Sequence, residues 1–331
     1  MGDTMADHAY GQTPSVKPAE LHTGCKINLF LDVLDRLENG YHTLRTLLIP
    51  LSDPSDTLIC LPQERGITVR CTTPGIDPAE NTLTKAYALY AEAGAFSPGL
   101  SIELRKGIPH SAGLGGGSAD AAALLLYLQQ CAGPSALSGG ALSVVAAQVG
   151  ADVPFFLRNK PALGQGIGEK LTPLAWNELP VNGLSLVLVC PNIRVSTDWA
   201  YAAWDKAQTT LTAPARKGTR AFRAPLITPG FAPGLTSGAK PDTDFSWLRN
   251  SLEPMVFAAH PELADLRARF LQRGAAAALM SGSGASVFGL FRSRGTALEA
   301  AKDFAYEGER VFMHDFPVHR PETTTGVSPS W

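Results

Sequence analysis

The feature that most constrains this chain is a cluster of glycines directly in front of a long apolar stretch. Four of the five residues at 113–117 are glycine, and SADAAALLLYLQQCAG follows them. This stretch is apolar nearly all round, which predicts a buried helix with Ser118 available as its cap. Glycines let successive N–H groups turn toward one ligand, and a helix N-terminus adds partial positive charge. The pattern therefore predicts a phosphate-binding loop, with a turn made only for packing as the alternative.

Neither of the common nucleotide-binding motifs is present in this segment. The Walker pattern G-x-x-x-x-G-K-[ST] is absent, and Ser118 occupies the position of the third glycine in the Rossmann pattern G-x-G-x-x-G. The two most frequent nucleotide-binding folds therefore lose support.

Length and composition bound the class of protein. The 331 residues favour two domains, and 45% hydrophobic with 18% charged residues predict a globular chain with a substantial core. A net charge of −2 gives no excess of positive charge of the kind that favours binding to nucleic acid or an anionic membrane. The five cysteines form no C-x-x-C pair, which argues against a disulfide framework or a zinc site. The absence of a signal peptide or membrane-spanning run favours a cytoplasmic protein, and a monomer or weak homodimer is expected.

The order of strand and helix patterns predicts an α+β chain. Residues 1–21 are polar and aperiodic, so we expect a flexible N-terminal extension. Two strands are expected on either side of Asn39-Gly40, a strong turn signal. A helix is expected from Asn81, and Pro154 is expected to bias Val153 away from helix.

A boundary is expected after Leu174, where a fresh buried strand begins. The predicted domains are residues 22–174 and 175–331. Within the second, residues 205–244 are rich in Pro, Gly, Thr and Ala, which predicts a loop excursion. Helix, glycine-turn and strand patterns near the C-terminus predict a small α/β or ferredoxin-like unit.

The stretch from Lys106 to Ala121, with Pro109 followed by Gly-Leu-Gly-Gly-Gly-Ser, resembles the phosphate loop of the GHMP kinase superfamily. Four further stretches lie in the order seen in one branch of that superfamily, which acts on 4-diphosphocytidyl-2-C-methyl-D-erythritol: KINLFL from residue 26, NGYHTL from 39, GADVPFF from 150 and LMSGSGASVF from 279. The resemblance implies a two-domain GHMP kinase fold, with an N-terminal domain like the second domain of ribosomal protein S5 and a ferredoxin-like C-terminal domain. It also implies transfer of the ATP γ-phosphate, with Mg²⁺, to the 2-hydroxyl of that cytidine compound, a step of non-mevalonate isoprenoid synthesis.

The resemblance also implies roles for individual residues. Asp152 corresponds to the catalytic carboxylate and Lys26 to the lysine beside it. The ATP-binding positions are Asn81, Lys106, Pro109, Ala112, Gly113, Leu114, Gly115, Gly116, Gly117 and Ser118. The substrate-binding positions are Asn28, Tyr41, His42 and Tyr201, the last three around the cytidine, and the magnesium ligands stay open. An Asp near a lysine should have a lowered pKa, so Asp152 would chiefly orient the alcohol and take its proton late.

Each of these residues also has a simpler interpretation. Asp152 could cap the turn before Pro154, Lys26 could be a solvated surface lysine, and Asn81 could be a helix cap. Tyr41-His42 could form the polar face of a hairpin. Ser281-Gly282-Ser283-Gly284 could be a tight turn rather than a part of the active cleft.

Two other functions remain open at this point. One is a GHMP kinase for another small alcohol, such as homoserine or mevalonate, and the other is a catalytically silent relative that binds a nucleotide or sugar. Tyr41 and His42 favour a cytidine-bearing substrate over the first. Lys26 together with Asp152 argues against the second.

Overall fold

The computed structural model describes residues 16–73, 81–94, 96–212 and 245–317. It divides into two compact units, each built from separate stretches of the chain. The first unit comprises Met1–Cys25, Pro54–Ile108 and Gly115–Asn159; the second comprises Lys26–Asp53, Pro109–Leu114 and Lys160–Trp331. The predicted boundary after Leu174 stays a prediction.

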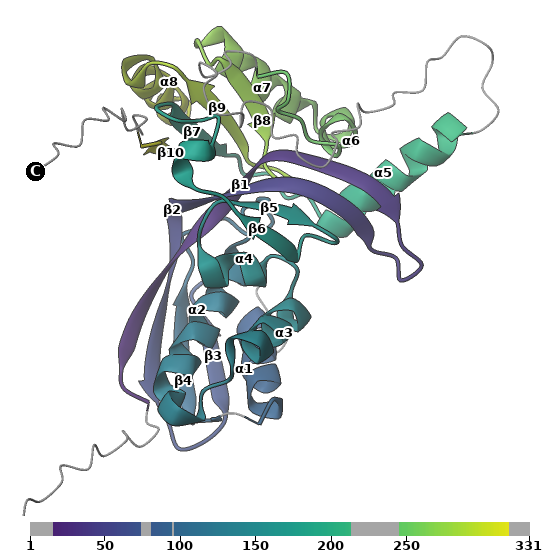
Figure 1. Cartoon of the computed structure of the whole chain (residues 1–331). Coiled ribbons are helices and arrows are strands. Elements are labelled where there is room, and N and C mark those ends of the chain that lie inside the picture. Colours follow the sequence, from purple (N-terminus) through teal and green to yellow (C-terminus); the bar gives the residue numbers. More distant parts are fainter. Residues whose placement is uncertain (1–15, 74–80, 95, 213–244, 318–331) are drawn as a thin grey trace, which may run out of the picture. The chain divides into compact units, whose positions relative to one another are not determined.

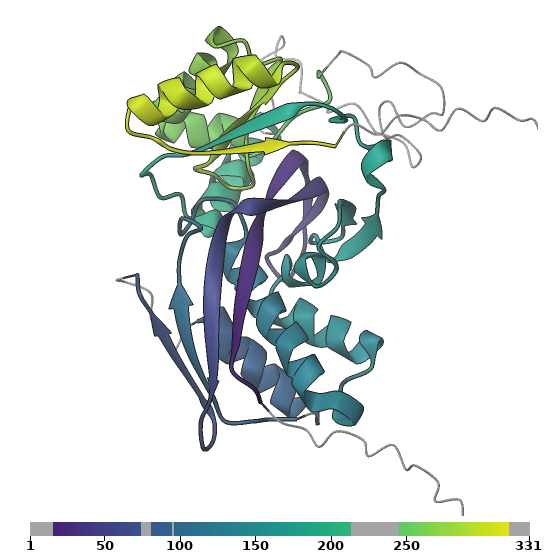
Figure 2. The same ribbon diagram turned by 90° about the vertical axis from the view of Figure 1, so that its left-hand side faces the viewer.

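The first unit is a layer of strands with helices on one face (Figures 1 and 2). Its elements are the start of β1 (Ala19–Arg36), the end of β2 (His42–Pro62), β3 (Ile67–Cys71), α1 (Thr82–Glu92), β4 (Leu100–Arg105), α2 (Gly116–Ala132), a 3-10 turn (Gly133–Ser135), α3 (Gly139–Val149) and α4 (Val153–Arg158). Strand β4 pairs antiparallel with β2 and parallel with β3. Helix α2 is buried on most sides, as its apolar sequence predicts.

The second unit contains a four-stranded antiparallel sheet in the order β10-β7-β9-β8. Its elements are the remainder of β1 and β2, β5 (Ala162–Gln165), β6 (Lys170–Pro173), a 3-10 turn (Trp176–Glu178), β7 (Ser185–Cys190), α5 (Thr197–Thr212), α6 (Glu253–Ala259), α7 (Pro261–Gln272), β8 (Ala277–Met280), β9 (Val287–Phe291), α8 (Arg294–Tyr306) and β10 (Arg310–Asp315). Numbered along the chain, the four strands lie in the order 4-1-3-2 with helices in the two crossovers, which is the ferredoxin-like arrangement. The predicted ferredoxin-like unit is therefore confirmed.

Apolar side chains of α7 and α8 and of the sheet form the core of this part. Phe270 of α7, Phe291 of β9 and Phe304 of α8 are fully buried in it. The rings of Phe270 and Phe304 lie 4.5 Å apart, centroid to centroid. The four-stranded sheet therefore has a packed helical face.

The hairpin predicted at Asn39-Gly40 is confirmed. Strands β1 and β2 pair on either side of it, and Gly40 has φ +85°, which glycine adopts without a steric penalty. The backbone N–H of Leu37 donates to the carbonyl of Tyr41 at 2.7 Å and closes the turn. The turn sets the register of His42, the first residue of β2.

Three local predictions need correction. Strand β1 begins at Ala19, so residues 19–21 are not part of an extension, and residues 1–15 lie outside the described part. Val153 begins helix α4 because Pro154 stands in the first turn, where a missing N–H leaves no intrahelical bond unmade. Helix α5 continues to Thr212, so residues 205–212 of the predicted excursion are helical, and residues 213–244 lie outside the described part.

Within the described ranges, none of the helices has both the length and the hydropathy needed to cross a membrane.

Candidate functional site

The glycine-rich loop, residues 107–118, leads into helix α2. The N-cap of α2 is Gly115, in the left-handed conformation with φ +74°, and no side chain caps this N-terminus. The predicted cap Ser118 instead stands in the first helical turn, because the chain enters the helix through a conformation that glycine adopts more readily than serine. The first N–H groups of α2 therefore meet the requirements of an anion-binding site.

The middle of the loop, residues 109–114, belongs to the second unit, and its carbonyl groups contact other residues of that unit. The backbone N–H of Lys26 donates to Leu114 at 2.9 Å, and the Ser281 hydroxyl donates to the carbonyl of Gly113 at 3.1 Å. Gly113 has φ +74°, and a Cβ there would lie 2.1 Å from the Ser281 carbonyl oxygen. The glycine turn at 281–284 thus packs directly against the loop, so it is more than a local turn.

Lys26 is a buried lysine rather than a solvated one, with only 5% of its surface exposed. Its ammonium donates to Asn28 Oδ1 at 2.6 Å, and the Asn28 amide donates to Thr46 Oγ1 at 2.7 Å. Both Lys26 and Asn28 project from the same face of β1, because strand side chains alternate. The simpler interpretation of Lys26 as a surface lysine is therefore wrong.

Asp152 precedes α4 and occupies its N-cap position. Its side chain makes no capping hydrogen bond to that helix. Asp152 is therefore not a side-chain cap of α4, and its simpler interpretation as a cap of the turn before Pro154 stays a prediction. Asp152 belongs to the first unit and Lys26 to the second, so their pairing stays a prediction.

His42 lies in an aromatic cluster with residues of α5. Its ring stacks on Tyr201, with centroids 5.0 Å apart and planes 25° apart, and meets Trp204 edge-on at 5.6 Å. His42 Nε2 lies 2.7 Å from Asp205 Oδ1. Since an ionised carboxylate only accepts, Nε2 carries the proton, and in a neutral ring Nδ1 is then an acceptor. Tyr41 is 59% exposed beside the hairpin turn.

The structure therefore joins two of the three predicted cytidine-binding residues, His42 and Tyr201. Sequence reasoning missed Trp204 and Asp205. Their signal was their helical spacing of three and four residues from Tyr201, which places them on one side of α5.

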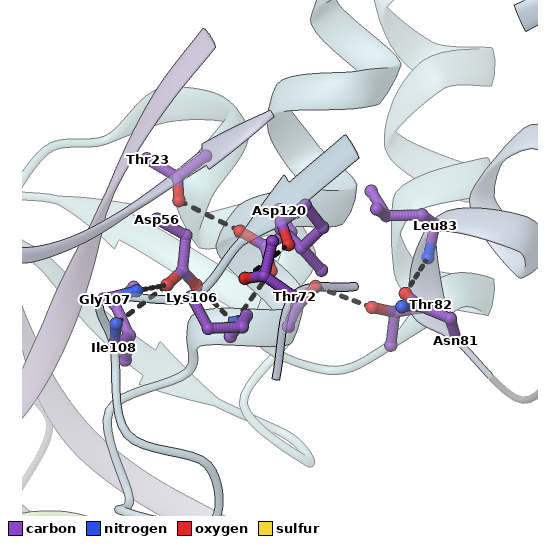
Figure 3. Close-up of polar contacts among 12 residues, drawn as sticks. Thr23, Asp56, Thr72, Asn81, Thr82, Leu83, Lys106, Gly107, Ile108 and Asp120 are labelled. Atoms are coloured by element: carbon purple, nitrogen blue, oxygen red, sulfur yellow. Dashed lines mark hydrogen bonds and ion pairs between the residues drawn. The ribbon is translucent and has the colours of Figure 1, made fainter. Parts of the chain in front are cut away.

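Asn81 is the N-cap of α1, as its simpler interpretation predicts. Its side-chain oxygen accepts from the N–H of Leu83 at 3.0 Å. The adjacent Thr82 hydroxyl donates to the carbonyl of Gly117 at 2.9 Å, so the start of α1 contacts the first turn of α2 (Figure 3). A role of Asn81 in binding ATP stays a prediction.

Lys106 is held by two carboxylates that sequence reasoning did not find. Figure 3 shows Asp56 of β2 and Asp120 of α2 directed toward its ammonium. Burial lowers the pKa of Lys106, but the two carboxylates outweigh this and leave it above its ordinary value. Burial raises the pKa of Asp120 to about 7, against the opposing effect of Lys106. Asp56 lies within β2 and contacts Lys106 across 50 positions, so no local pattern in the sequence indicates this ion pair.

Among the described residues, no group of three or more His, Cys, Asp or Glu side chains is placed to hold a metal ion.

Comparisons with known proteins agree with this architecture. The model of the GHMP kinases N terminal domain matches residues 81–160, and that of the GHMP kinases C terminal domain matches residues 235–310. A 4-diphosphocytidyl-2-C-methyl-D-erythritol kinase from Nitratidesulfovibrio vulgaris, strain Hildenborough, is 48% identical over 295 residues, which span 89% of this chain and 97% of that protein.

Two solved structures are similar over almost their whole length. A crystal structure of 4-(cytidine 5'-diphospho)-2C-methyl-D-erythritol kinase superimposes with a TM-score of 0.68 at 34% identity, covering 90% of this chain and 98% of that one. A homoserine kinase from Cytophaga hutchinsonii superimposes with a TM-score of 0.63 at 19% identity, covering 94% and 99%. The second similarity concerns the fold alone.

Proposed function

Because this chain belongs to the GHMP kinases, and among them to the family of 4-diphosphocytidyl-2-C-methyl-D-erythritol kinases, we propose that it transfers the γ-phosphoryl group of ATP to the 2-hydroxyl of 4-diphosphocytidyl-2-C-methyl-D-erythritol. The observation that carries this proposal is 48% identity over 97% of a relative with that name. The reaction is a step of non-mevalonate isoprenoid synthesis. A cytoplasmic location and a monomer or weak homodimer belong to the same proposal.

The glycine-rich loop is the proposed site of the ATP phosphates. Residues 110–118 supply closely spaced backbone N–H groups, and the N-terminus of α2 adds its partial positive charge. Mg²⁺ bound to the phosphates would neutralise part of their charge during transfer. The uncapped first turn of α2 supports this placement.

Asp152 is the proposed partner of the substrate hydroxyl. It orients the 2-hydroxyl for attack and accepts its proton, while Lys26 neutralises negative charge that develops on the transferred group. Asn28 fixes the Lys26 ammonium through the 2.6 Å hydrogen bond. Phosphoryl transfer depends chiefly on such positioning, so a strongly basic carboxylate is not required.

The aromatic cluster is the proposed site of the cytosine. Asp205 fixes the proton on Nε2 of His42, so Nδ1 can accept a hydrogen bond from the exocyclic amine of the base. Tyr201 holds the His42 ring by stacking, and the exposed ring of Tyr41 is available to stack on the pyrimidine. Homoserine and mevalonate have no aromatic base that could both stack on Tyr41 and present an exocyclic amine to His42.

The direct test of the function is incubation of the purified protein with ATP, Mg²⁺ and a panel of alcohols. We expect phosphorylation of 4-diphosphocytidyl-2-C-methyl-D-erythritol and no phosphorylation of homoserine or mevalonate, as measured by mass spectrometry of the products. Phosphorylation of homoserine or mevalonate instead of the cytidine compound would overturn the proposal. A protein that binds ATP but phosphorylates none of the three would be a silent relative.

Replacing His42 by Ala is expected to raise the KM for the cytidine substrate by about tenfold or more, because a lost hydrogen bond to the base costs on the order of 1 kcal/mol and the stacked ring is lost with it. The KM for ATP should stay within about twofold of the parent value. His314→Ala is the control, since this histidine contacts the Asp53 carbonyl away from the aromatic cluster. An effect of His42→Ala confined to ATP would remove His42 from the cytosine site.

A further inference from the structure

A buried group of charged side chains lies at the two ends of the glycine-rich loop. The Lys106 ammonium contacts a carboxylate oxygen of Asp56 and, at 2.9 Å, Oδ2 of Asp120. Thr23 of β1 donates to the other oxygen of Asp120 at 3.0 Å. The side chains of all three charged residues are at least nine-tenths buried, so their attraction is weakly screened by solvent.

Asp56 holds the entry of the loop through its backbone. Its Oδ1 accepts from the N–H of Gly107 at 2.7 Å and from the N–H of Ile108 at 2.8 Å, while Oδ2 contacts Lys106 (Figure 3). A Cβ on Gly107 would lie 2.0 Å from the Ser55 carbonyl oxygen, so this entry also packs closely on β2. One carboxylate thus fixes two successive amides and one ammonium.

Asp120 belongs to the second turn of α2, just past the exit of the loop. A Cβ on Gly116, the first residue of α2, would lie 3.0 Å from Ile108 Cγ2 and 3.3 Å from Asp56 Oδ2. The helix start and the loop entry are therefore in direct contact. Lys106 joins the carboxylate at the entry to the carboxylate on the helix.

Stability alone is a weak explanation of this group. Burying two carboxylates and one ammonium has a large desolvation cost, which the mutual attraction offsets only when the geometry is good. The raised pKa of Asp120 reflects that cost. A buried ion pair can favour one backbone conformation over others. Here the conformation that it would favour is that of the loop entry and the start of α2.

We propose that Asp56, Lys106 and Asp120 are positioning residues that hold the glycine-rich loop in its phosphate-binding conformation, and that Lys106 acts through the loop rather than on the adenine. The proposal rests on the proposed function only for the identity of the ligand, a nucleotide polyphosphate. It predicts that losing the Lys106 ammonium weakens contacts to phosphate and spares contacts to the base.

The test compares two probes, ADP and adenosine, because adenosine has no phosphate. Dissociation constants for both are measured by ligand-observed NMR on the full chain carrying Lys106→Met, Asp120→Ala or both. Each single substitution is expected to raise the dissociation constant of ADP by roughly tenfold or more, which is the loss expected for one charge-assisted contact. The dissociation constant of adenosine should change by less than about twofold. In the double variant the dissociation constant of ADP should rise by less than the product of the two single effects, since Lys106 and Asp120 belong to the same ion-paired group. Asp120→Asn keeps one oxygen acceptor for Lys106 and places an NH2 donor beside the Thr23 hydroxyl, whose oxygen can accept, so it should restore most of the ADP affinity.

Asp32→Asn is the matched control, because Asp32 is also buried but pairs through both carboxylate oxygens with Arg249, which is not a residue of this loop. If Lys106→Met does not fold, the double variant Lys106→Met with Asp120→Asn leaves only Asp56 charged, and Asp56 keeps its two amide donors.

The proposal would be overturned if Lys106→Met lost adenosine binding while Asp120→Ala bound both ADP and adenosine like the parent protein. That result would mean that Lys106 contacts the base directly. A fall in thermal stability with ADP binding unchanged would reduce the group to a structural role. Both results are independent of the alcohol panel. A failure of the parent protein to bind ADP at all would instead count against the proposed function.

Discussion

Replacing Asp152 by Asn is expected to lower kcat by about 10²-fold or more, because a positioned side chain that accepts a proton contributes roughly that much to catalysis. Binding of ADP and the thermal stability should stay close to the parent values, since the Asp152 side chain does not cap α4. Steady-state kinetics with 4-diphosphocytidyl-2-C-methyl-D-erythritol, together with calorimetric titration of ADP, measure both sides of this prediction. The amide keeps the size of the carboxylate, so a loss of rate reports on charge and proton transfer rather than on packing.

The matched control is Ser138→Ala, which removes a genuine N-cap in the same unit. The Ser138 hydroxyl accepts from the N–H of Ala141 at the start of α3, and losing such a cap costs about 1 kcal/mol. Ser138→Ala should therefore lower the unfolding free energy and leave kcat unchanged, the reverse of Asp152→Asn. Parent-like kcat in Asp152→Asn would remove this carboxylate from the chemistry.

The parts of the fold that the sequence predicts are those determined by local chemistry. The turn at Asn39-Gly40 and the helix capped by Asn81 each depend on residues close together in the chain. The errors arise where two local signals compete. The residue before a proline disfavours helix, which predicts that Val153 is not helical, but a proline in the first turn is compatible with starting a helix, and α4 begins at Val153.

The sequence predicts only part of the candidate site, because several of its contacts join residues far apart in the chain. Asp56 reaches Lys106 across 50 positions, and His42 reaches Asp205 across 163. No periodicity links such pairs, so only a resemblance or a structure can bring them together. The resemblance predicted the GHMP kinase family, which the comparisons confirm, but it gave no role to Asp56, Asp120, Trp204 or Asp205.

Gly113→Ala is expected to be the most damaging single substitution in the glycine-rich loop, because two separate costs coincide there. An L-residue at φ +74° costs roughly 1–2 kcal/mol, and a Cβ placed 2.1 Å from the Ser281 carbonyl forces a shift of backbone, with a further cost of about 1–3 kcal/mol. If the loop moves to relieve this contact, its N–H groups leave the phosphates. We therefore expect kcat/KM for ATP to fall by about 10²-fold or more and the urea midpoint to drop.

Gly308→Ala separates these two costs. Gly308 has φ +87° in the second unit but no atom within 4 Å of the position of an added Cβ, so it carries the backbone cost without the close contact. Urea unfolding of both variants should show a loss of roughly 1–2 kcal/mol in Gly308→Ala and a larger loss in Gly113→Ala. Only Gly113→Ala should weaken the use of ATP. Equal losses in the two variants, with parent-like KM for ATP in both, would mean that the contact between the Ser281 turn and the glycine-rich loop does not shape the phosphate site, and the role of that turn would have to be sought elsewhere.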